Sequence, residues 1–300
     1  MNTPRRHHYV WRYYLSAWES DGGIAVSRSD GSHFKSDAKN VAVQRDFYRI
    51  PELSDADIDV VKKFIALHPS HLHEQAFDWL NMYAAPALLR KAIRHSGNEI
   101  SAHQEEQIQQ LEIIAEESVH SALEEDALPL LAGLVSGQRD PWVAEDDAMI
   151  FSLFLAFQHV RTKRMRDTVL NNAKAEHLGS FTRVYPVMRA ILASNLGWSW
   201  YSDRKNWGIR RLTAGGKLEF ITSDQPTWNM LEPTGSNALS IYYPVSPRAA
   251  ILFENLNNDS VLPPNDQLTD AEVAGLNRIV ADKSHEQIFG SDIEYLKSLR

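Results

Sequence analysis

The sequence predicts an α+β protein whose mixed or antiparallel sheet is built from both ends of the chain. Aromatic and β-branched residues, broken by glycine-containing turns, are frequent in 1–53 and again in 197–300. Between these ends, apolar residues recur at helical spacing over about 54–195. We therefore expect a single domain, 1–300, in which 54–196 is a helical insert between two sheet-forming ends.

The N-terminal end is expected to begin with a hairpin and then to change into helix. From Tyr9 to about Val26, residues typical of strands are interrupted by Asp21-Gly22-Gly23, and a second turn is predicted at Asp30-Gly31. Ser54 is followed three residues later by Asp57, which is the spacing of a capping box. The first helix of the insert is therefore expected to start there.

The helical insert is predicted to break near Pro69, at Ser96-Gly97 and between Gly137 and Pro141. One of its helices is expected to run from about Glu145 to Ala173. The C-terminal end returns to strand patterns, at Trp207–Leu212, Lys217–Thr222, Ala238–Tyr243 and Ala249–Phe253.

A last helix is predicted at Thr269, where Glu272 completes a second capping box. Its apolar stripe contains Asn277. A buried amide must form hydrogen bonds, so we expect Asn277 to bond a backbone edge and to have a structural role.

The net charge of −8 comes from one segment. Between Ser96 and Gln138 there are nine acidic residues and no lysine or arginine, so the rest of the chain is close to neutral. We expect these acids on the solvated face of a helix, with an acidic binding surface as the alternative. The apolar stripe of that helix would be Ile108, Leu111, Ala115, Val119 and Ala122.

Composition excludes several classes of protein. The chain has no cysteine, so it has no disulfide framework, no thiol nucleophile and no thiolate metal site. The most apolar stretch, Ala148–Phe157, is too short to cross a bilayer as a helix, and no signal peptide is visible. We expect a cytoplasmic protein that does not associate with membranes.

The helix predicted from Glu145 carries a charge on its buried side. Arg161 falls within the apolar sector, and Gln158 lies at its edge. A guanidinium stays charged, so on a buried face it needs a carboxylate, several carbonyls or an anionic ligand. Both interpretations stay open: a buried ion pair, or an arginine that reaches a phosphate or carboxylate. Cations follow at Lys163, Arg164 and Arg166, where the dipole of the expected C-terminal half would also favour them.

A third polar feature is the strand end at 220–226. A hydrophobic run passes into Thr222, Ser223 and Asp224 and is stopped by Pro226. Side chains at strand ends are held rigidly and reach into clefts, which suits a catalytic carboxylate. Taken alone, the segment is better explained as a turn that ends the strand.

Taken together, these segments resemble the bacterial domain-of-unknown-function family 4238. The resemblance covers nearly the whole chain and rests on the order of its motifs: His7-His8-Tyr9-Val10 with Tyr14-Leu15, Asn40-Val41-Ala42 with Phe47-Tyr48, Gln158-His159-Val160-Arg161-Thr162, Ile221-Thr222-Ser223-Asp224-Gln225-Pro226, Tyr243-Pro244-Val245-Ser246-Pro247, and Asn277 with Ile288-Phe289. The chain departs from the family in having Trp11-Arg12 and Gln225. The resemblance implies that His7, His8, Gln158, Arg161, Ser223 and Asp224 converge, and it supplies no reaction.

Two function classes follow. The first is a hydrolase of a phosphate-bearing substrate, such as a nuclease or phosphodiesterase, for which a divalent metal is a candidate cofactor and a nucleic acid or nucleotide a candidate partner. The second is a non-catalytic sensor or binding module that recognises an anionic ligand or a partner protein. The candidate catalytic residues are His7, His8 and Asp224, and the candidate substrate-binding residues are Arg161, Gln158, Ser223 and Arg12.

Two other patterns are weaker. His68, His71 and His73 offer three imidazoles without a carboxylate at metal-ligand spacing, so we do not expect a metal site there. Arg90 and His95 have the spacing of the HEPN ribonucleases, but five residues along a helix they do not share a face.

Overall fold

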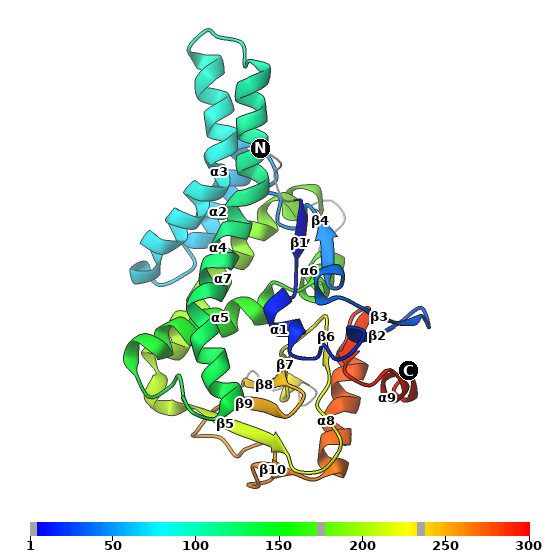
Figure 1. Ribbon diagram of the computed structural model, residues 1–300. Coiled ribbons are helices and arrows are strands. Elements are labelled where there is room, and N and C mark those ends of the chain that lie inside the picture. The colour runs from blue at the N-terminus through cyan, green and yellow to red at the C-terminus, as the bar shows by residue number, and fades with distance from the viewer. Residues whose placement is uncertain (1–4, 173–177, 233–237) are drawn as a thin grey trace.

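In the computed structural model, which describes residues 5–172, 178–232 and 238–300, the chain has the predicted α+β fold. Long helices from the middle of the chain pack above sheets formed by its two ends (Figure 1). The helices of these residues are α1 (Arg12–Ser16), α2 (Asp55–Ile65), α3 (His73–His95), α4 (Ala102–Ser136), α5 (Glu145–Val160), α6 (Lys163–Asn171), α7 (Leu178–Ser202), α8 (Asp270–Lys283) and α9 (Ile293–Ser298). The strands are β1 (Arg6–His8), β2 (Ile24–Arg28), β3 (His33–Ser36), β4 (Val43–Arg45), β5 (Trp207–Ala214), β6 (Thr222–Ser223), β7 (Trp228–Asn229), β8 (Ser240–Ser246), β9 (Ala249–Asn255), β10 (Gln267–Leu268) and β11 (Gln287–Gly290).

One sheet joins the two ends of the chain directly. Its order is β3-β2-β11-β6, with every pair antiparallel, so the C-terminal strand β11 lies between the N-terminal β2 and β6. A separate antiparallel pair, β1 and β4, carries His7 and His8. The prediction that N- and C-terminal segments build a common sheet is confirmed.

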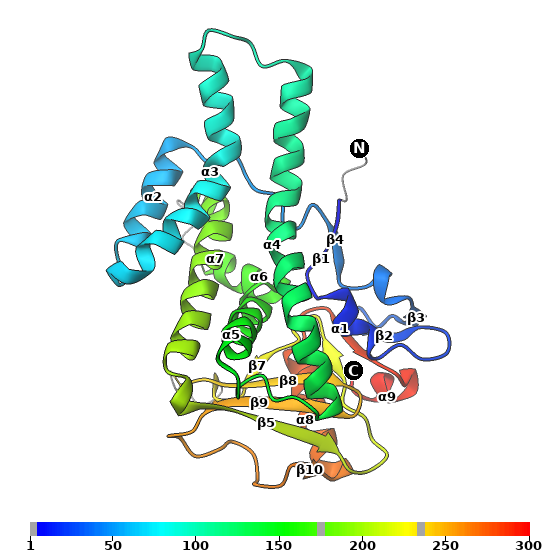
Figure 2. The same cartoon turned by 60° about the vertical axis from the view of Figure 1, so that its left-hand side comes forward.

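The second large sheet has the order β10-β5-β9-β8-β7, antiparallel except for the β10–β5 pair. Alternate residues of β8 and β9 face opposite sides. On one side Tyr243 and Phe253 pack with residues of α4 and α5, and on the other Tyr242 and Leu252 pack with residues of α8. Figure 2 shows the end of α4 on one side of this sheet and α8 on the other.

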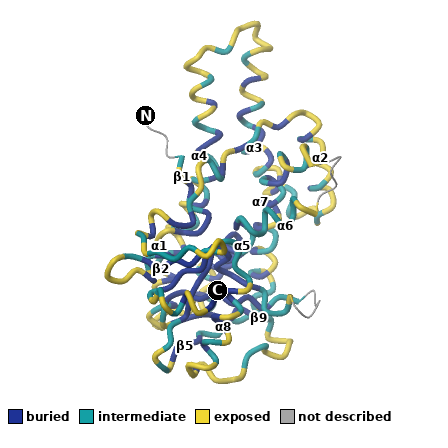
Figure 3. Tube along the Cα trace, turned by 90° about the vertical axis from the view of Figure 1, so that its right-hand side faces the viewer, coloured by how far each residue is buried: buried dark blue, intermediate teal, exposed yellow. Residues whose placement is uncertain are grey.

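The outer ends of α3 and α4 extend away from the sheets as a helical hairpin. Figure 3 shows that these ends are largely exposed, whereas buried residues concentrate around the sheets and the lower halves of the helices. No helix in the described ranges is both long and apolar enough to cross a membrane.

The expected N-terminal hairpin is wrong, because α1 forms in its place. The aromatic residues there serve the core: the Tyr14 hydroxyl donates to the Pro244 carbonyl at 2.7 Å, and the Trp18 indole donates to the Phe220 carbonyl at 2.7 Å. Long-range burial therefore overrides the strand preference of the segment.

The helix expected from Glu145 to Ala173 is also wrong. It is broken into α5 and α6: Arg161 is the C-cap of α5, and Thr162 caps α6 by accepting a hydrogen bond from the Met165 backbone. Ala173 lies outside the described residues.

Both predicted capping boxes are present, at Ser54 with Asp57 and at Thr269 with Glu272. Asn277 has the expected structural role. Its side-chain oxygen accepts from the Ile221 backbone at 3.0 Å, and its nitrogen donates to the Glu219 carbonyl at 2.8 Å.

Candidate functional site

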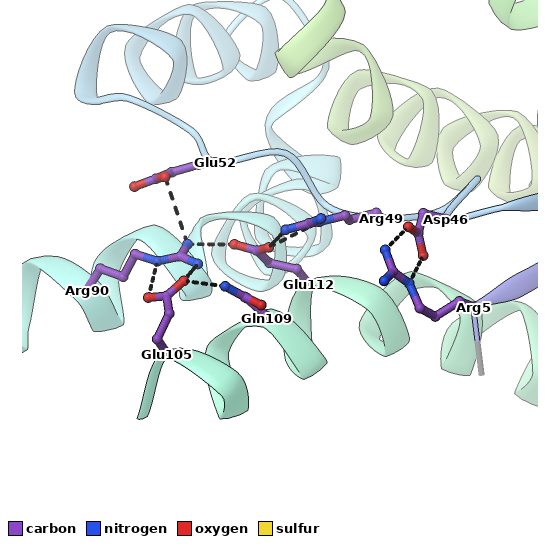
Figure 4. Close-up of polar contacts among 8 residues, drawn as sticks. All are labelled: Arg5, Asp46, Arg49, Glu52, Arg90, Glu105, Gln109 and Glu112. Carbon is purple, nitrogen blue, oxygen red and sulfur yellow. Dashed lines mark hydrogen bonds and ion pairs between the residues drawn. The ribbon is translucent and has the colours of Figure 1, made fainter. Parts of the chain in front are cut away.

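The expectation that the acids of α4 face solvent holds only in part: Glu106, Glu125 and Asp126 are exposed, but two other acids are buried against arginines. Glu112 and Glu116 are only 3% and 4% exposed. Figure 4 shows the Arg90 guanidinium between the carboxylates of Glu105 and Glu112, at 2.7 and 2.5 Å, with Arg49 on the other side of Glu112 at 2.8 Å. These arginines come from outside α4 and compensate carboxylates that could not otherwise be buried.

Along the same face of α4, toward its C-terminal end, further ionisable residues follow at four-residue spacing: Glu116, His120 and Glu124. Arg189 of α7 pairs with Glu116, and Arg161 pairs with Glu124 at 2.7 Å. The expected apolar stripe is only partly buried: Ile108 is buried as predicted, but Leu111, Ala115 and Val119 are half-buried and Ala122 is exposed.

Arg161 is 1% exposed and is held on two sides. Besides its ion pair with Glu124, its Nη2 donates to the Gln158 side chain at 3.0 Å, while its Nε is buried without a partner among the described residues. Of the two interpretations of Arg161, the buried ion pair is present in the structure. We call Arg161, Gln158, Glu124, Glu117 and His8 the Arg161 cluster.

The pKa values of Glu117 and His8, two members of this cluster, are shifted in opposite directions. Burial, reinforced by Glu124 and Glu116 and opposed by Arg161, raises the pKa of Glu117 to about 7. Burial and the charges of Arg12, Arg6 and Arg161 lower the pKa of His8 to about 4. At neutral pH His8 is therefore neutral, and Glu117 is close to half protonated.

The other two N-terminal candidates are placed differently. The buried His7 ring accepts a hydrogen bond from the Tyr48 backbone at 3.0 Å through Nδ1 and stacks on the Tyr48 ring. Arg12 is exposed on the surface and acts on the cluster through its charge on His8.

Asp224 is fully buried, and its carboxylate is occupied by backbone. It accepts hydrogen bonds from three consecutive N–H groups, those of His285, Glu286 and Gln287, at 2.7 to 3.0 Å. Burial raises the pKa of Asp224, and the three donors act against that shift. Ser223, beside it, closes the turn by donating to the Gln225 carbonyl at 2.8 Å.

We call the Asp224 carboxylate, together with the three N–H groups that it binds, the Asp224 clasp. The clasp holds the segment 283–287 in place, and that segment contacts α6. Lys163 pairs with Glu286, Arg164 donates to the Lys283 carbonyl, and the His285 ring lies 3.1 Å from the Asp167 carboxylate. Asp224 thus fixes the position of α6 through an intermediate segment.

Residues adjacent in sequence to Gln158 and to Asp224 line a cavity of about 190 Å³, which we call the junction cavity. From α5 and α6 it is lined by His159, Arg164, Met165 and Thr168. From the segment after β6 it is lined by Gln225, Trp228, Asn229 and Glu232. The predicted site residues Gln158, Arg161, Ser223 and Asp224 thus do not line the cavity themselves, but their near neighbours in sequence do.

The charges at the cavity are unusual for the start of a helix. The break at Arg161 places Lys163, Arg164 and Arg166 in the first turn of α6, which contains no acidic residue. Cations at a helix N-terminus oppose the helix dipole, by about 0.3–1 kcal/mol each. Lys163 and Arg166 have acidic partners, Glu286 and Asp167.

Arg164 has no carboxylate partner in the part of the chain that the structure describes, and it shares an indole with a second cation. Its Cζ lies 5.1 Å from the centre of a Trp228 ring, and the Lys283 Nζ lies 4.8 Å from the same ring. Such cation–π contacts stabilise each charge but do not neutralise it. The side of the cavity formed by Arg164 and Trp228 is therefore positively charged.

A neutral imidazole completes this wall. Burial lowers the pKa of His159 to about 4, and its Nδ1 lies 3.1 Å from the Thr227 hydroxyl. If the hydroxyl donates to Nδ1, Nε2 carries the ring hydrogen and is a hydrogen-bond donor.

Sequence reasoning missed His159, Arg164 and Trp228 as site residues. A signal was available in Thr162, a good N-cap residue directly before a run of cations. Placing a helix start there would have put the cations where the dipole disfavours them, and so pointed to an anionic ligand.

The weaker sequence patterns have structural explanations. The His68 Nδ1 lies 2.9 Å from the Phe64 carbonyl, and the His73 Nε2 lies 2.8 Å from the His68 carbonyl. Among the described residues no group of three or more His, Asp or Glu side chains could hold a metal ion. Arg90 is engaged by Glu105 and Glu112, as described above.

Comparison with known proteins identifies one family. The family model described as a protein of unknown function, DUF4238, matches residues 6–185 and 201–294. No curated protein and no solved structure matches the chain.

Proposed function

The chain belongs to the DUF4238 family of proteins of unknown function, and we propose that it binds a phosphate-bearing ligand in the junction cavity. The observation that carries this proposal is the position of Arg164, which lines the cavity without a carboxylate partner in the described ranges. A guanidinium offers several N–H donors in a plane and suits phosphate geometry.

Three further features support a phosphate rather than a neutral ligand. Arg164 and Lys283 both lie within about 5 Å of one indole, so an anion between or beside them would relieve their repulsion. The cavity is next to the first turn of α6, where the helix dipole favours negative charge. His159 and the exposed Thr168 hydroxyl can supply neutral hydrogen bonds.

In this proposal the family motifs have a scaffolding role. The Arg161 cluster fixes the end of α5, and the Asp224 clasp fixes the start of α6. The protein is then a sensor or binding module for an anionic ligand. A cytoplasmic location is part of the proposal.

The test is calorimetric titration with ribose 5-phosphate, using Arg164→Gln and, as a matched control on the same helix, Arg166→Gln. We expect the native chain to bind and Arg164→Gln to bind about 10- to 100-fold more weakly, because a charge-assisted hydrogen bond contributes about 1.5–3 kcal/mol. Arg166 stacks on Phe47 and does not line the cavity, so its replacement should change affinity less than about threefold. Absence of binding to the native chain, or equal losses in both variants, would contradict the proposal.

A second candidate function is hydrolysis of a phosphate ester at the Arg161 cluster, which we propose on one observation. Glu117 has its pKa raised to about 7 beside Arg161, and such a carboxyl is poised for general acid–base catalysis near neutral pH. Its carboxylate would take a proton from water as the water oxygen forms a bond to phosphorus and the ester oxygen leaves.

Hydrolysis is tested with labelled DNA, RNA and nucleotides, each with and without divalent metal. A general base acts when deprotonated, so the rate should rise as pH increases from about 5 to 7 and level off above the Glu117 pKa. Glu117→Gln should lower the rate at least 100-fold, and Glu125→Gln, an exposed control on the same helix, should leave it unchanged. No turnover of any substrate, or activity that survives in Glu117→Gln, excludes this candidate.

A further inference from the structure

The junction cavity contains an acid as well as a cation. Glu232 lines it together with Arg164, and no ion pair joins these two side chains in the described parts of the chain. Glu232 is exposed, and an ionised carboxylate is an acceptor only. A simple phosphate satisfies Arg164 but leaves Glu232 as an unfavourable neighbour. A ligand that fits both must have an anionic end and, at some distance, a hydrogen-bond donor.

The cavity has room for a group larger than phosphate. An engineered protein cavity of about 150 Å³ holds one benzene molecule. The junction cavity, at about 190 Å³, is therefore large enough for one heteroaromatic ring system, with the phosphate at its edge.

The apolar part of the lining suits such a ring. Met165 and Trp228 supply a polarisable thioether and an indole, both of which make favourable contacts with aromatic groups. The amides of Gln225 and Asn229 are already committed. Gln225 bonds Thr162 and the Thr227 carbonyl, and Asn229 accepts from the backbone of Leu231 and Ser240. Glu232 is thus the lining carboxylate available to a ring donor.

We propose that the phosphate-bearing ligand of the junction cavity is a nucleoside monophosphate whose base carries an exocyclic amino group. The phosphate lies at Arg164, the base lies against Met165 and Trp228, and its amino group donates to Glu232. Carboxylates accept hydrogen bonds from base amino groups in this way in nucleic-acid recognition. This inference rests on the proposed function and adds to it the class of ligand and the residue that selects the base.

The test compares AMP, UMP, adenosine, ribose 5-phosphate and phosphoethanolamine by calorimetric titration of the full chain. We expect AMP to bind at least tenfold more tightly than ribose 5-phosphate, which lacks the base, and than phosphoethanolamine, which has the amine and phosphate without a ring. Adenosine, which lacks the phosphate, should also bind at least tenfold more weakly than AMP. UMP carries carbonyl groups and no exocyclic amino group on its base, so it should bind at least fivefold more weakly than AMP.

Glu232→Gln is the discriminating variant. Glu232 is exposed, so its replacement should leave the fold intact. The amide can donate as well as accept, so the preference for AMP over UMP should fall below twofold, while affinity for ribose 5-phosphate should be unchanged or higher. If ribose 5-phosphate binds as tightly as AMP, or if the AMP preference persists in Glu232→Gln, the nucleotide inference fails and the proposed phosphate site stands. If neither AMP nor ribose 5-phosphate binds, both fail.

Discussion

Asp224→Ala is expected to lower the free energy of unfolding by about 4 kcal/mol. The substitution removes a fully buried acceptor from the three N–H groups of 285–287, of which that of Gln287 belongs to a buried residue and the other two to half-buried residues. Each unsatisfied buried donor costs about 1–3 kcal/mol. Urea denaturation at pH 7 measures the loss.

Asp266→Ala is the matched control. Asp266 is 65% exposed and pairs with Arg210, so its removal should cost less than about 1 kcal/mol. Because 283–287 holds α6, Asp224→Ala should also weaken ligand binding at the junction cavity, although Asp224 does not line it. An Asp224→Ala variant as stable as Asp266→Ala would contradict the stabilising role of the Asp224 carboxylate.

Arg161→Met is expected to lower the free energy of unfolding by about 3–5 kcal/mol. The Arg161 side chain is 1% exposed and that of Glu124 16%, so the substitution leaves a largely buried carboxylate without its counter-charge. Arg161→Lys keeps the charge but offers fewer fixed donors to Glu124 and Gln158, so its loss should be intermediate. Urea denaturation again provides the measurement.

Two further variants, a control at an exposed ion pair and a double variant, test this prediction. Arg204→Met breaks an ion pair with Glu145 in which the two side chains are 40% and 62% exposed, and it should cost at most about 1 kcal/mol. The double variant Arg161→Met, Glu124→Gln should be more stable than Arg161→Met alone, because the uncompensated charge is removed. If the second substitution makes the protein less stable still, the account of Arg161 as a buried ion pair is wrong.

The parts of the fold that were predictable from sequence depend on local signals. The capping boxes at Ser54 and Thr269 mark helix starts because their hydrogen bonds join residues three apart. The strands at both ends follow from side-chain alternation, and their union in one sheet follows from the need to cover a common core.

The errors have a different origin. Aromatic residues such as Tyr14 and Trp18 suit either strand or helix, and their choice is made by partners about 200 or more residues away, at Pro244 and Phe220. The burial of Glu112 and Glu116 likewise depends on arginines from outside α4. No local pattern contains this information.

The sequence singled out residues close to those that line the junction cavity, but not the roles that they take in the structure. Arg161 and Asp224 stood out as polar groups in apolar surroundings, and their near neighbours in sequence line the cavity. Arg161 forms an ion pair that holds helices together, and Asp224 binds backbone N–H groups. The junction cavity is lined by neighbours such as Arg164 and Trp228. Whether a polar residue points into a cavity or into a hydrogen-bonded network depends on the break between α5 and α6, which neither glycine nor proline marks.

The most direct test of the phosphate site is to locate a bound oxyanion. Crystals of the native chain soaked in tungstate, an anomalously scattering analogue of phosphate, should show an anomalous peak within hydrogen-bonding distance of the Arg164 guanidinium in the junction cavity. The peak should be absent from Arg164→Gln crystals soaked in the same way and present in Arg166→Gln crystals. A native crystal with tungstate elsewhere and none at Arg164, or a peak unchanged in Arg164→Gln, would contradict the account.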